Sequence, residues 1–238
     1  MIYTFGINIP YMKFHLWGAI PIWNMILLVS VVFVAFVLPI LPASLHHHLF
    51  RLAYTLIYIS GIYSLERRTH SMFFLFLATI FSEWISGIFQ LEFLSLVAKC
   101  VNILFFIVVV AALITQIAKA RVVNLQVILG SMAGYLLLGI IYSFFVILLM
   151  LNDPGSYNYT LPPGLPHHAI GVDSSVPLYY SFVTLASLGY GDVVPIKPLS
   201  RSLATWITVS GQFYIAVIVA LLVGKFSAQQ HREHHRDA

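Results

Sequence analysis

The sequence predicts an all-α membrane protein whose chain crosses the bilayer six times and carries one short re-entrant helix. Two observations lead to this fold class. Of the 238 residues, 60% are hydrophobic and only 8% are charged, whereas a soluble domain carries about 25% charged residues. In addition, apolar stretches long enough to cross the hydrocarbon core, which takes roughly 20 residues, recur along the chain. Lipid is therefore the expected solvent for most of the surface.

Six apolar stretches meet this length requirement, and turn-forming or charged residues separate them. Pro39 and Pro42 end the first stretch, and the charged run 66–68 separates the second from the third. Residues 119–121, which include two basic side chains, separate the fourth from the fifth. The expected spans are residues 21–41, 47–65, 71–91, 93–117, 124–151 and 200–226.

The basic residues are divided unequally between the two sides of the expected membrane domain. With an even number of crossings, both ends of the chain lie on one side. Because cytoplasmic loops carry an excess of lysine and arginine, the side richer in these residues is expected to be cytoplasmic, and both termini with it. That side would hold Lys13, Arg67, Arg68, Lys119, Arg121, Lys225, Arg232 and Arg236. The other side would hold Lys197 and Arg201, with Arg51 near the end of a span.

A different kind of segment lies between the fifth and sixth stretches. Residues 152–176 are rich in Pro, Gly, Ser and Asn, which is typical of an exposed loop. Residues 177–186 are mostly apolar but too few to span, so we expect a short re-entrant helix. Pro177 would occupy its first turn, where the missing N–H is not needed. The chain then reads S-L-G-Y-G-D over residues 187–192.

This glycine-containing segment is unusual at membrane depth. Irregular backbone is tolerated there only where it is buried in protein or lines a water-filled path. Gly189 and Gly191 allow backbone angles that other residues resist. Such a strand can point successive carbonyl oxygens at one axis, where they replace the water shell of a cation. The C-terminal, negative end of the short helix would favour cations at the same place.

The residues 184–192, T-L-A-S-L-G-Y-G-D, resemble the potassium-channel signature T-x-x-T-x-G-Y-G-D, and the resemblance extends over residues 124–226. It implies a homotetramer in membrane lipid, because one chain supplies one strand of the filter and the family closes its ring with four. It also implies K⁺ as the permeant ligand, with no cofactor. The resemblance assigns ion binding to the carbonyls of Ser187, Leu188, Gly189 and Tyr190 and to the Ser187 hydroxyl. It assigns filter support to Thr184, Tyr179, Tyr180, Gly191 and Asp192, with Asp192 tied to the tyrosine pair, and the inner cavity and hinge to Gly211, Gln212, Ile215 and Val219.

Two residues depart from the family pattern. Ser187 replaces the usual threonine; its hydroxyl can still coordinate an ion, but it lacks the methyl group and packs more loosely. Leu188 replaces the commoner valine or isoleucine. The departures leave a weakly selective cation channel open as an alternative to a potassium-selective one. A non-conducting partner subunit of another channel is a third reading. We find no nucleotide-binding loop or catalytic constellation and expect neither an enzyme nor a nucleic-acid partner.

Residues 1–120 stand where voltage-gated relatives carry a voltage sensor. The fourth helix of a sensor needs basic residues at three-residue spacing, but the fourth stretch offers only Lys99. We therefore expect a four-helix domain that is not a typical voltage sensor, a pore domain over 121–227 and a short cytoplasmic tail over 228–238. The chain looks most like compact prokaryotic six-span channels without a ligand-binding domain, which implies the plasma membrane.

Three charged residues fall inside the first four stretches. Arg51, Glu83 and Lys99 are expected at similar depths near the outer surface. A structural ion cluster that holds three helices together is favoured over a sensing site. The histidines at 46–48 and 167–168 are expected in outer loops, as solvated side chains or as pH- or zinc-sensitive groups.

Overall fold

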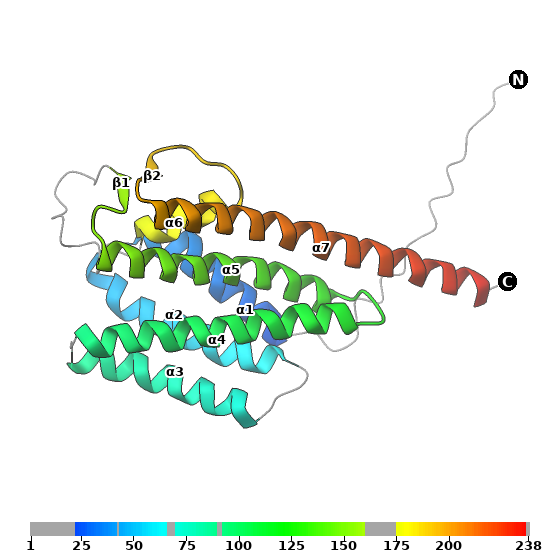
Figure 1. Cartoon of the computed structure of the whole chain (residues 1–238). Helices are drawn as coiled ribbons and strands as arrows, with labels where there is room; N and C mark the ends of the chain where they lie inside the picture. Colours follow the sequence, from blue (N-terminus) through cyan, green and yellow to red (C-terminus); the bar gives the residue numbers. More distant parts are fainter. Residues whose placement is uncertain (1–21, 42, 66–69, 90–91, 160–174, 237–238) are drawn as a thin grey trace, which may run out of the picture.

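The computed structural model describes residues 22–41, 43–65, 70–89, 92–159 and 175–236 (Figure 1). Most of these residues are helical. Within the described residues, four helical segments are long and apolar enough to cross a membrane: Ile22–Ile40, Leu96–Lys119, Leu125–Asn152 and Pro198–Gln230. This agrees with the expected all-α membrane class.

The first two helices form an antiparallel pair. Helix α1 (Ile22–Val32) continues through a π-helical turn (Phe33–Val37) and a 3₁₀ turn (Leu38–Ile40). Pro39 lies in the 3₁₀ turn and prevents regular α-helix around it, because it has no N–H and its ring clashes with the carbonyl four residues earlier. Helix α2 (Ala43–Ser64) then returns along α1.

Helices α3 (His70–Phe89) and α4 (Glu92–Lys119) pack against one another, and α3 also packs against α2. The loop 120–124 is too short to carry the chain away, so α5 (Leu125–Asn152) lies directly beside α4. Asn124 begins α5 as its N-cap, because its side-chain oxygen accepts from the Val127 N–H at 3.0 Å.

The remaining elements follow α5. Strand β1 (Tyr157–Tyr159) pairs antiparallel with β2 (Val193–Pro195), a contact that the sequence analysis did not predict. The short helix α6 (Ser175–Leu185) packs between α5 and α7 (Pro198–Arg236). Helix α7 is continuous and extends beyond the other helices (Figure 1), so the segment expected as a separate tail continues the helix to Arg236.

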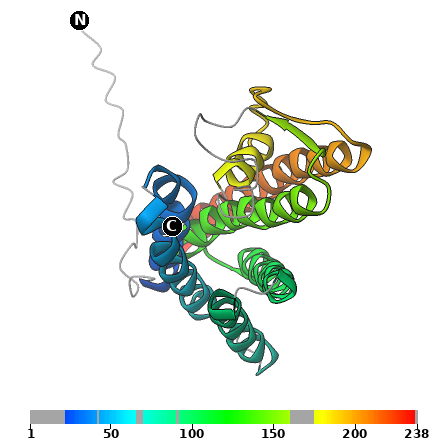
Figure 2. The ribbon, with the colours of Figure 1, turned by 90° about the vertical axis from the view of Figure 1, so that its left-hand side faces the viewer.

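One hydrophobic core joins the first four helices to α5. It includes the fully buried side chains of Leu27 on α1, Tyr58 on α2, Phe106 on α4 and Leu137 on α5. Figure 2 shows α5, α6 and α7 gathered on one side of the molecule, with α2 and α3 on the other. The short helix and the loop after it are thus carried by a rigid base made largely of α5 and α7.

Candidate functional site

Helix α6 ends in a pair of backbone hydrogen bonds that turns the chain sharply. The Leu188 N–H donates to the Val183 carbonyl at 2.9 Å, and the Ser187 N–H donates to the Thr184 carbonyl at 3.0 Å. This pattern is a Schellman motif, in which the residue just after the C-cap adopts a left-handed conformation. Ser187 takes that position with φ +60°. Left-handed backbone costs a non-glycine residue about 1–2 kcal/mol, so surrounding contacts must hold Ser187 there.

The sign of φ alternates along residues 187–191 of the loop. Ser187, Gly189 and Gly191 have φ values of +60°, +58° and +81°. In the described part of the chain Ser187 is the one non-glycine residue with positive φ, so Leu188 and Tyr190 have negative φ. In an ordinary strand φ is negative throughout and successive carbonyls point in opposite directions. An alternating sign of φ can instead turn neighbouring peptide groups the same way. The loop can therefore present a row of carbonyl oxygens to one cation path.

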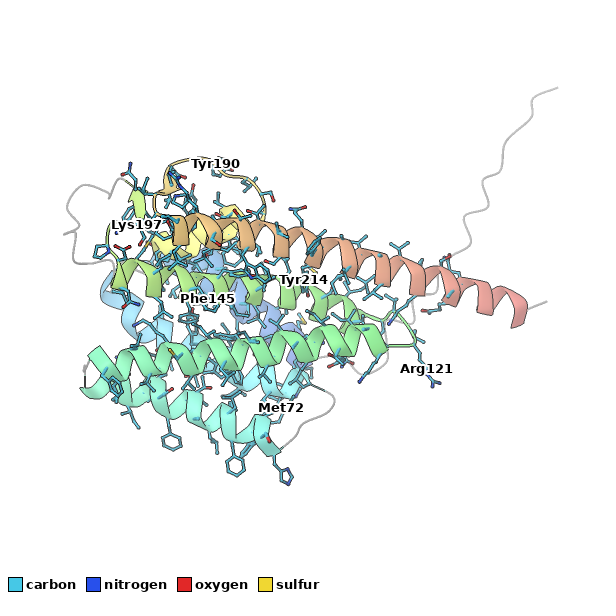
Figure 3. The ribbon with its side chains drawn as sticks, viewed as in Figure 1. Met72, Arg121, Phe145, Tyr190, Lys197 and Tyr214 are labelled. Atoms are coloured by element: carbon cyan, nitrogen blue, oxygen red, sulfur yellow. The ribbon has the colours of Figure 1, made fainter. Side chains whose placement is uncertain are left out.

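The same loop projects from the surface of the single chain. The side chains of Leu188 and Tyr190 are 57% and 69% exposed, and Figure 3 shows Tyr190 where the loop bows away from α6 and α7. A cavity of about 220 Å³ lies behind the loop, lined in part by Tyr179, Thr184 and Val193. Exposed apolar surface of this kind marks a site of association.

The outer end of the loop is tied to α6 by one tyrosine. The Tyr179 hydroxyl donates to Asp192 at 2.6 Å. This hydrogen bond lowers the pKa of Asp192. Tyr180 instead packs against Tyr157 on β1, with ring centroids 5.0 Å apart. Adjacent helical residues point about 100° apart, so only one member of the expected tyrosine pair reaches Asp192.

The inner end of the loop is tied to α7. Gln212 Nε2 donates to Ser187 Oγ at 2.8 Å, a contact that sequence reasoning missed although it named both residues. At the preceding position, a Cβ added to Gly211 would overlap the carbonyl oxygen of Leu185. Helix α7 runs unbroken through Gly211. In this conformation the glycine serves a close approach of α6 to α7, and its hinge role stays a prediction.

The candidate cavity residues share one face of α7. Gln212, Ile215 and Val219 are exposed and spaced three and four residues apart, which places them on one side of a helix. Tyr214 lies on the opposite, buried face, where its hydroxyl donates to the Ser131 carbonyl of α5 at 2.8 Å (Figure 3). Their position is compatible with a cavity wall, which stays a prediction for a single chain.

Thr184 contributes its backbone to the same junction. Its carbonyl accepts a hydrogen bond from the Thr208 hydroxyl at 3.3 Å, in addition to the bond from Ser187. The C-terminal end of α6 is therefore hydrogen-bonded to α7 at Thr208, three residues before Gly211. The first residue of the loop is bonded to α7 at Gln212. These contacts fix the place where the loop begins.

Glu83, one of the three expected intramembrane charges, belongs to a hydrogen-bonded chain across three helices. Asn102 Nδ2 on α4 donates to Glu83 Oε2 on α3 at 2.8 Å. The Tyr58 hydroxyl on α2 donates to Asn102 Oδ1 at 3.0 Å. Glu83 also interacts electrostatically with Lys99. Direct ion pairs of Glu83 with Lys99 or Arg51 stay predictions, while Asn102 and Tyr58 are partners that a search for charged residues overlooked.

One of the two expected histidine groups lies within the described residues. His46, His47 and His48 lie within α2 rather than in an outer loop. The pair at 167–168 lies outside the described residues.

Comparison with known proteins relates the pore part of the chain to ion channels. Residues 169–228, which include α6, the loop and most of α7, match the family model described as an ion channel. This match supports a pore-loop potassium channel family for this part of the chain. The match agrees with the resemblance that the glycine-containing segment indicated.

Two curated potassium channels are similar to this chain. The potassium voltage-gated channel subfamily A member 10 of Mus musculus and that of Homo sapiens are each 27% identical to it over 106 residues. The match covers 44% of this chain and 18% of each relative, so the chain spans about a fifth of the relatives' length. No solved structure matches the chain.

Proposed function

We propose that four copies of this chain form a potassium-selective pore that passes K⁺ passively down its gradient. The alternating backbone of the loop 187–192, placed at the C-terminal end of α6, is the observation that carries this proposal. The carbonyls of residues 187–190 and the Ser187 hydroxyl would replace the hydration shell of the ion. The negative end of α6 would further favour a cation at that position.

The exposed surfaces support a tetramer. Trp206 and Phe213 on α7 are 65% and 67% exposed, and with Leu188 and Tyr190 they leave the pore part of one chain uncovered. One loop can supply only one side of an ion path. Three further copies would complete the ring and cover these apolar side chains.

The proposed topology has six spans, with α6 as the re-entrant helix. Helices α2 and α3 would join the four most apolar segments as spans, shielded by their packing on α1 and α4. The distribution of basic residues supports cytoplasmic termini. The resemblance to compact channels supports a prokaryotic plasma membrane.

We expect weak voltage dependence at most. Moving one charge across the whole field is worth about 2.3 kcal/mol per 100 mV, and four copies of Lys99 could reach about 9 kcal/mol, above the roughly 5.5 kcal/mol that reverses a two-state equilibrium. Charge number alone thus leaves a response open. However, Lys99 lies near one end of α4 and interacts with Glu83, so little net charge can cross the field. Recordings in symmetric K⁺ should give a shallow conductance–voltage curve that Lys99→Gln barely alters.

Two other functions fit the same fold. Ser187 and Leu188 favour a weakly selective cation channel, and a non-conducting partner subunit is the third possibility. Purified protein in liposomes separates them through the reversal potential in mixed Na⁺ and K⁺. We expect a reversal potential near the equilibrium potential of K⁺. A value midway between the equilibrium potentials of K⁺ and Na⁺ would indicate a weakly selective channel. The absence of flux would indicate a partner subunit.

Gly189→Ala is the matched loss-of-function variant for this assay. A Cβ at Gly189 meets nothing within 4 Å in the single chain, so the cost arises from the backbone angle of +58° rather than from a clash. We expect a correctly assembled protein without selective K⁺ flux. Normal selectivity in this variant would contradict the filter assignment.

A further inference from the structure

The contact between Gln212 and Ser187 joins the inner helix directly to the first residue of the filter loop. We propose that Gln212 is a positioning residue, which fixes the Ser187 hydroxyl and so sets the strength of the innermost cation site. This inference rests on the proposed function of the loop as a potassium filter. It goes beyond that function because it assigns one side chain outside the filter to one ion site within it.

Ser187 needs an external contact to hold its side chain. A serine Cβ carries one heavy atom, so its hydroxyl can occupy three staggered positions, whereas the branched threonine side chain is restricted. The backbone explains why threonine would be unfavourable here. At φ +60° a β-branched residue is a genuine outlier. The chain therefore orders the hydroxyl by a hydrogen bond from α7 instead of by a methyl group.

The position of Gln212 is itself well defined. Gly211 allows α7 to touch the Leu185 carbonyl at the end of α6, and the Tyr214 hydroxyl bonds to α5 on the other face of the helix. The amide of Gln212 thus extends from a helix that is held on both sides. Its 2.8 Å bond reaches Ser187 from a fixed origin.

The hydrogen bond from Gln212 determines how the Ser187 oxygen can face a cation. A serine oxygen has one hydrogen to donate and two lone pairs to accept with. The Gln212 N–H occupies one lone pair. The second lone pair remains for a cation, and the amide fixes its direction. Without the amide, the hydroxyl would sample positions in which no lone pair faces the ion path.

Block by Ba²⁺, a divalent cation of nearly the radius of K⁺, reports on this inner site. We would apply Ba²⁺ to reconstituted tetramers from the side of the C-terminal end of α7. Gln212→Leu removes the amide, and Gln212→Asn keeps an amide that is one methylene too short to reach. Both should weaken Ba²⁺ block by about 3- to 10-fold, as expected from three free rotamers and one lost hydrogen bond. Gln230→Leu, which makes the same change at an exposed position of α7 outside the proposed pore site, should leave block unchanged.

The double variant tests whether Gln212 acts through the hydroxyl. In the Ser187→Ala background, which removes the hydroxyl, Gln212→Leu should have no further effect on block. The inference is wrong if Ba²⁺ blocks Gln212→Asn as strongly as wild type. It is also wrong if Gln212→Leu weakens block by the same factor in the Ser187→Ala background. In both cases the filter assignment stands. Wild-type protein that passes no K⁺ would instead overturn the proposed function, and with it this inference. Thermal unfolding of each tetramer provides the folding control.

Discussion

The ammonium nitrogen of Lys225 lies 2.6 Å from the carbonyl oxygen of Ile117, which joins the late part of α7 to the end of α4. The same nitrogen contacts the carbonyls of Ala118 and Ala120, each at 2.7 Å. The last carbonyls of a helix have no partner within it, and a lysine ammonium has three donors. One side chain on the proposed inner helix therefore satisfies three acceptors of the four-helix part.

Removing this ammonium should destabilise the chain. We expect Lys225→Met to lower the free energy of unfolding by about 1.5–3 kcal/mol, the usual value of hydrogen bonds to a charged group. Lys119→Met is the control, because Lys119 is an exposed lysine at the same helix end. Thermal unfolding in detergent measures both variants. Equal, small changes in the two would show that the Lys225 contacts contribute no more than a surface charge.

Two glycines of α7 should respond in opposite ways to alanine. At Gly211 the added methyl would overlap the Leu185 carbonyl oxygen, and backbone must move to admit it. At Gly224 it would meet nothing within 4 Å in the described structure. We expect Gly211→Ala to reduce tetramer yield and K⁺ flux, and Gly224→Ala to be neutral or to stabilise the helix by up to about 1 kcal/mol. Size-exclusion chromatography and flux assays compare them. A fully active Gly211→Ala tetramer would contradict the close approach of α6 and α7.

Acid should disrupt the outer end of the filter loop at a pH set by Tyr179. The hydrogen bond from the Tyr179 hydroxyl lowers the pKa of Asp192. The stability that this bond gives the folded loop is therefore fully present above the ordinary pKa of aspartate, and it is lost as the pH falls through the lowered pKa. In Tyr179→Phe the pKa of Asp192 should rise, so outer acid should inhibit conductance at a higher pH. Tyr180→Phe is the control, since Tyr180 packs on Tyr157 instead. Identical acid titrations for wild type and Tyr179→Phe would exclude this role of the hydrogen bond.

The hydrogen bonds from Tyr58 to Asn102 and from Asn102 to Glu83 should be more costly to break on one side than to remove on both. Tyr58 and Asn102 are only 1% and 2% exposed, so Asn102→Leu leaves a buried hydroxyl and the carboxylate without this partner. We expect a cost of about 1–3 kcal/mol in the free energy of unfolding. Adding Tyr58→Phe should recover part of that loss, because it removes the stranded hydroxyl. Thermal unfolding of the single and double variants tests this, and strictly additive losses would argue against it.

Much of the helical layout could be predicted from local pattern. Apolar length placed the long helices within a few residues of their observed ends, except that α7 continues past residue 226 to Arg236. Pro177 does lie within the short helix α6. These features depend on neighbours in sequence, such as missing N–H groups and uninterrupted apolar runs. The β1–β2 pair was missed because each strand is only three residues long and lies in a loop-like segment.

The candidate site was predictable as a set of residues but not as a set of contacts. The glycine spacing identified the loop, yet the pairing of Gln212 with Ser187 depends on how closely Gly211 lets α7 approach α6. Likewise, the sequence offered both tyrosines as partners of Asp192, and the rotation of α6 selects Tyr179. Charges were easy to single out along the first four helices, whereas the neutral Asn102 bonds Glu83 directly.

The sequence by itself determined the membrane class, the order of the helices and the glycine-containing loop, because hydrophobic length and backbone freedom are local properties of the chain. Only the tertiary structure decided which side chains meet: Lys225 with the end of α4, Tyr179 with Asp192, and Gln212 with Ser187. Gln212 and Ser187 are 25 residues apart and the Lys225 pair 108. Such contacts are set by the packing and rotation of whole helices, which hydrophobic pattern alone does not encode.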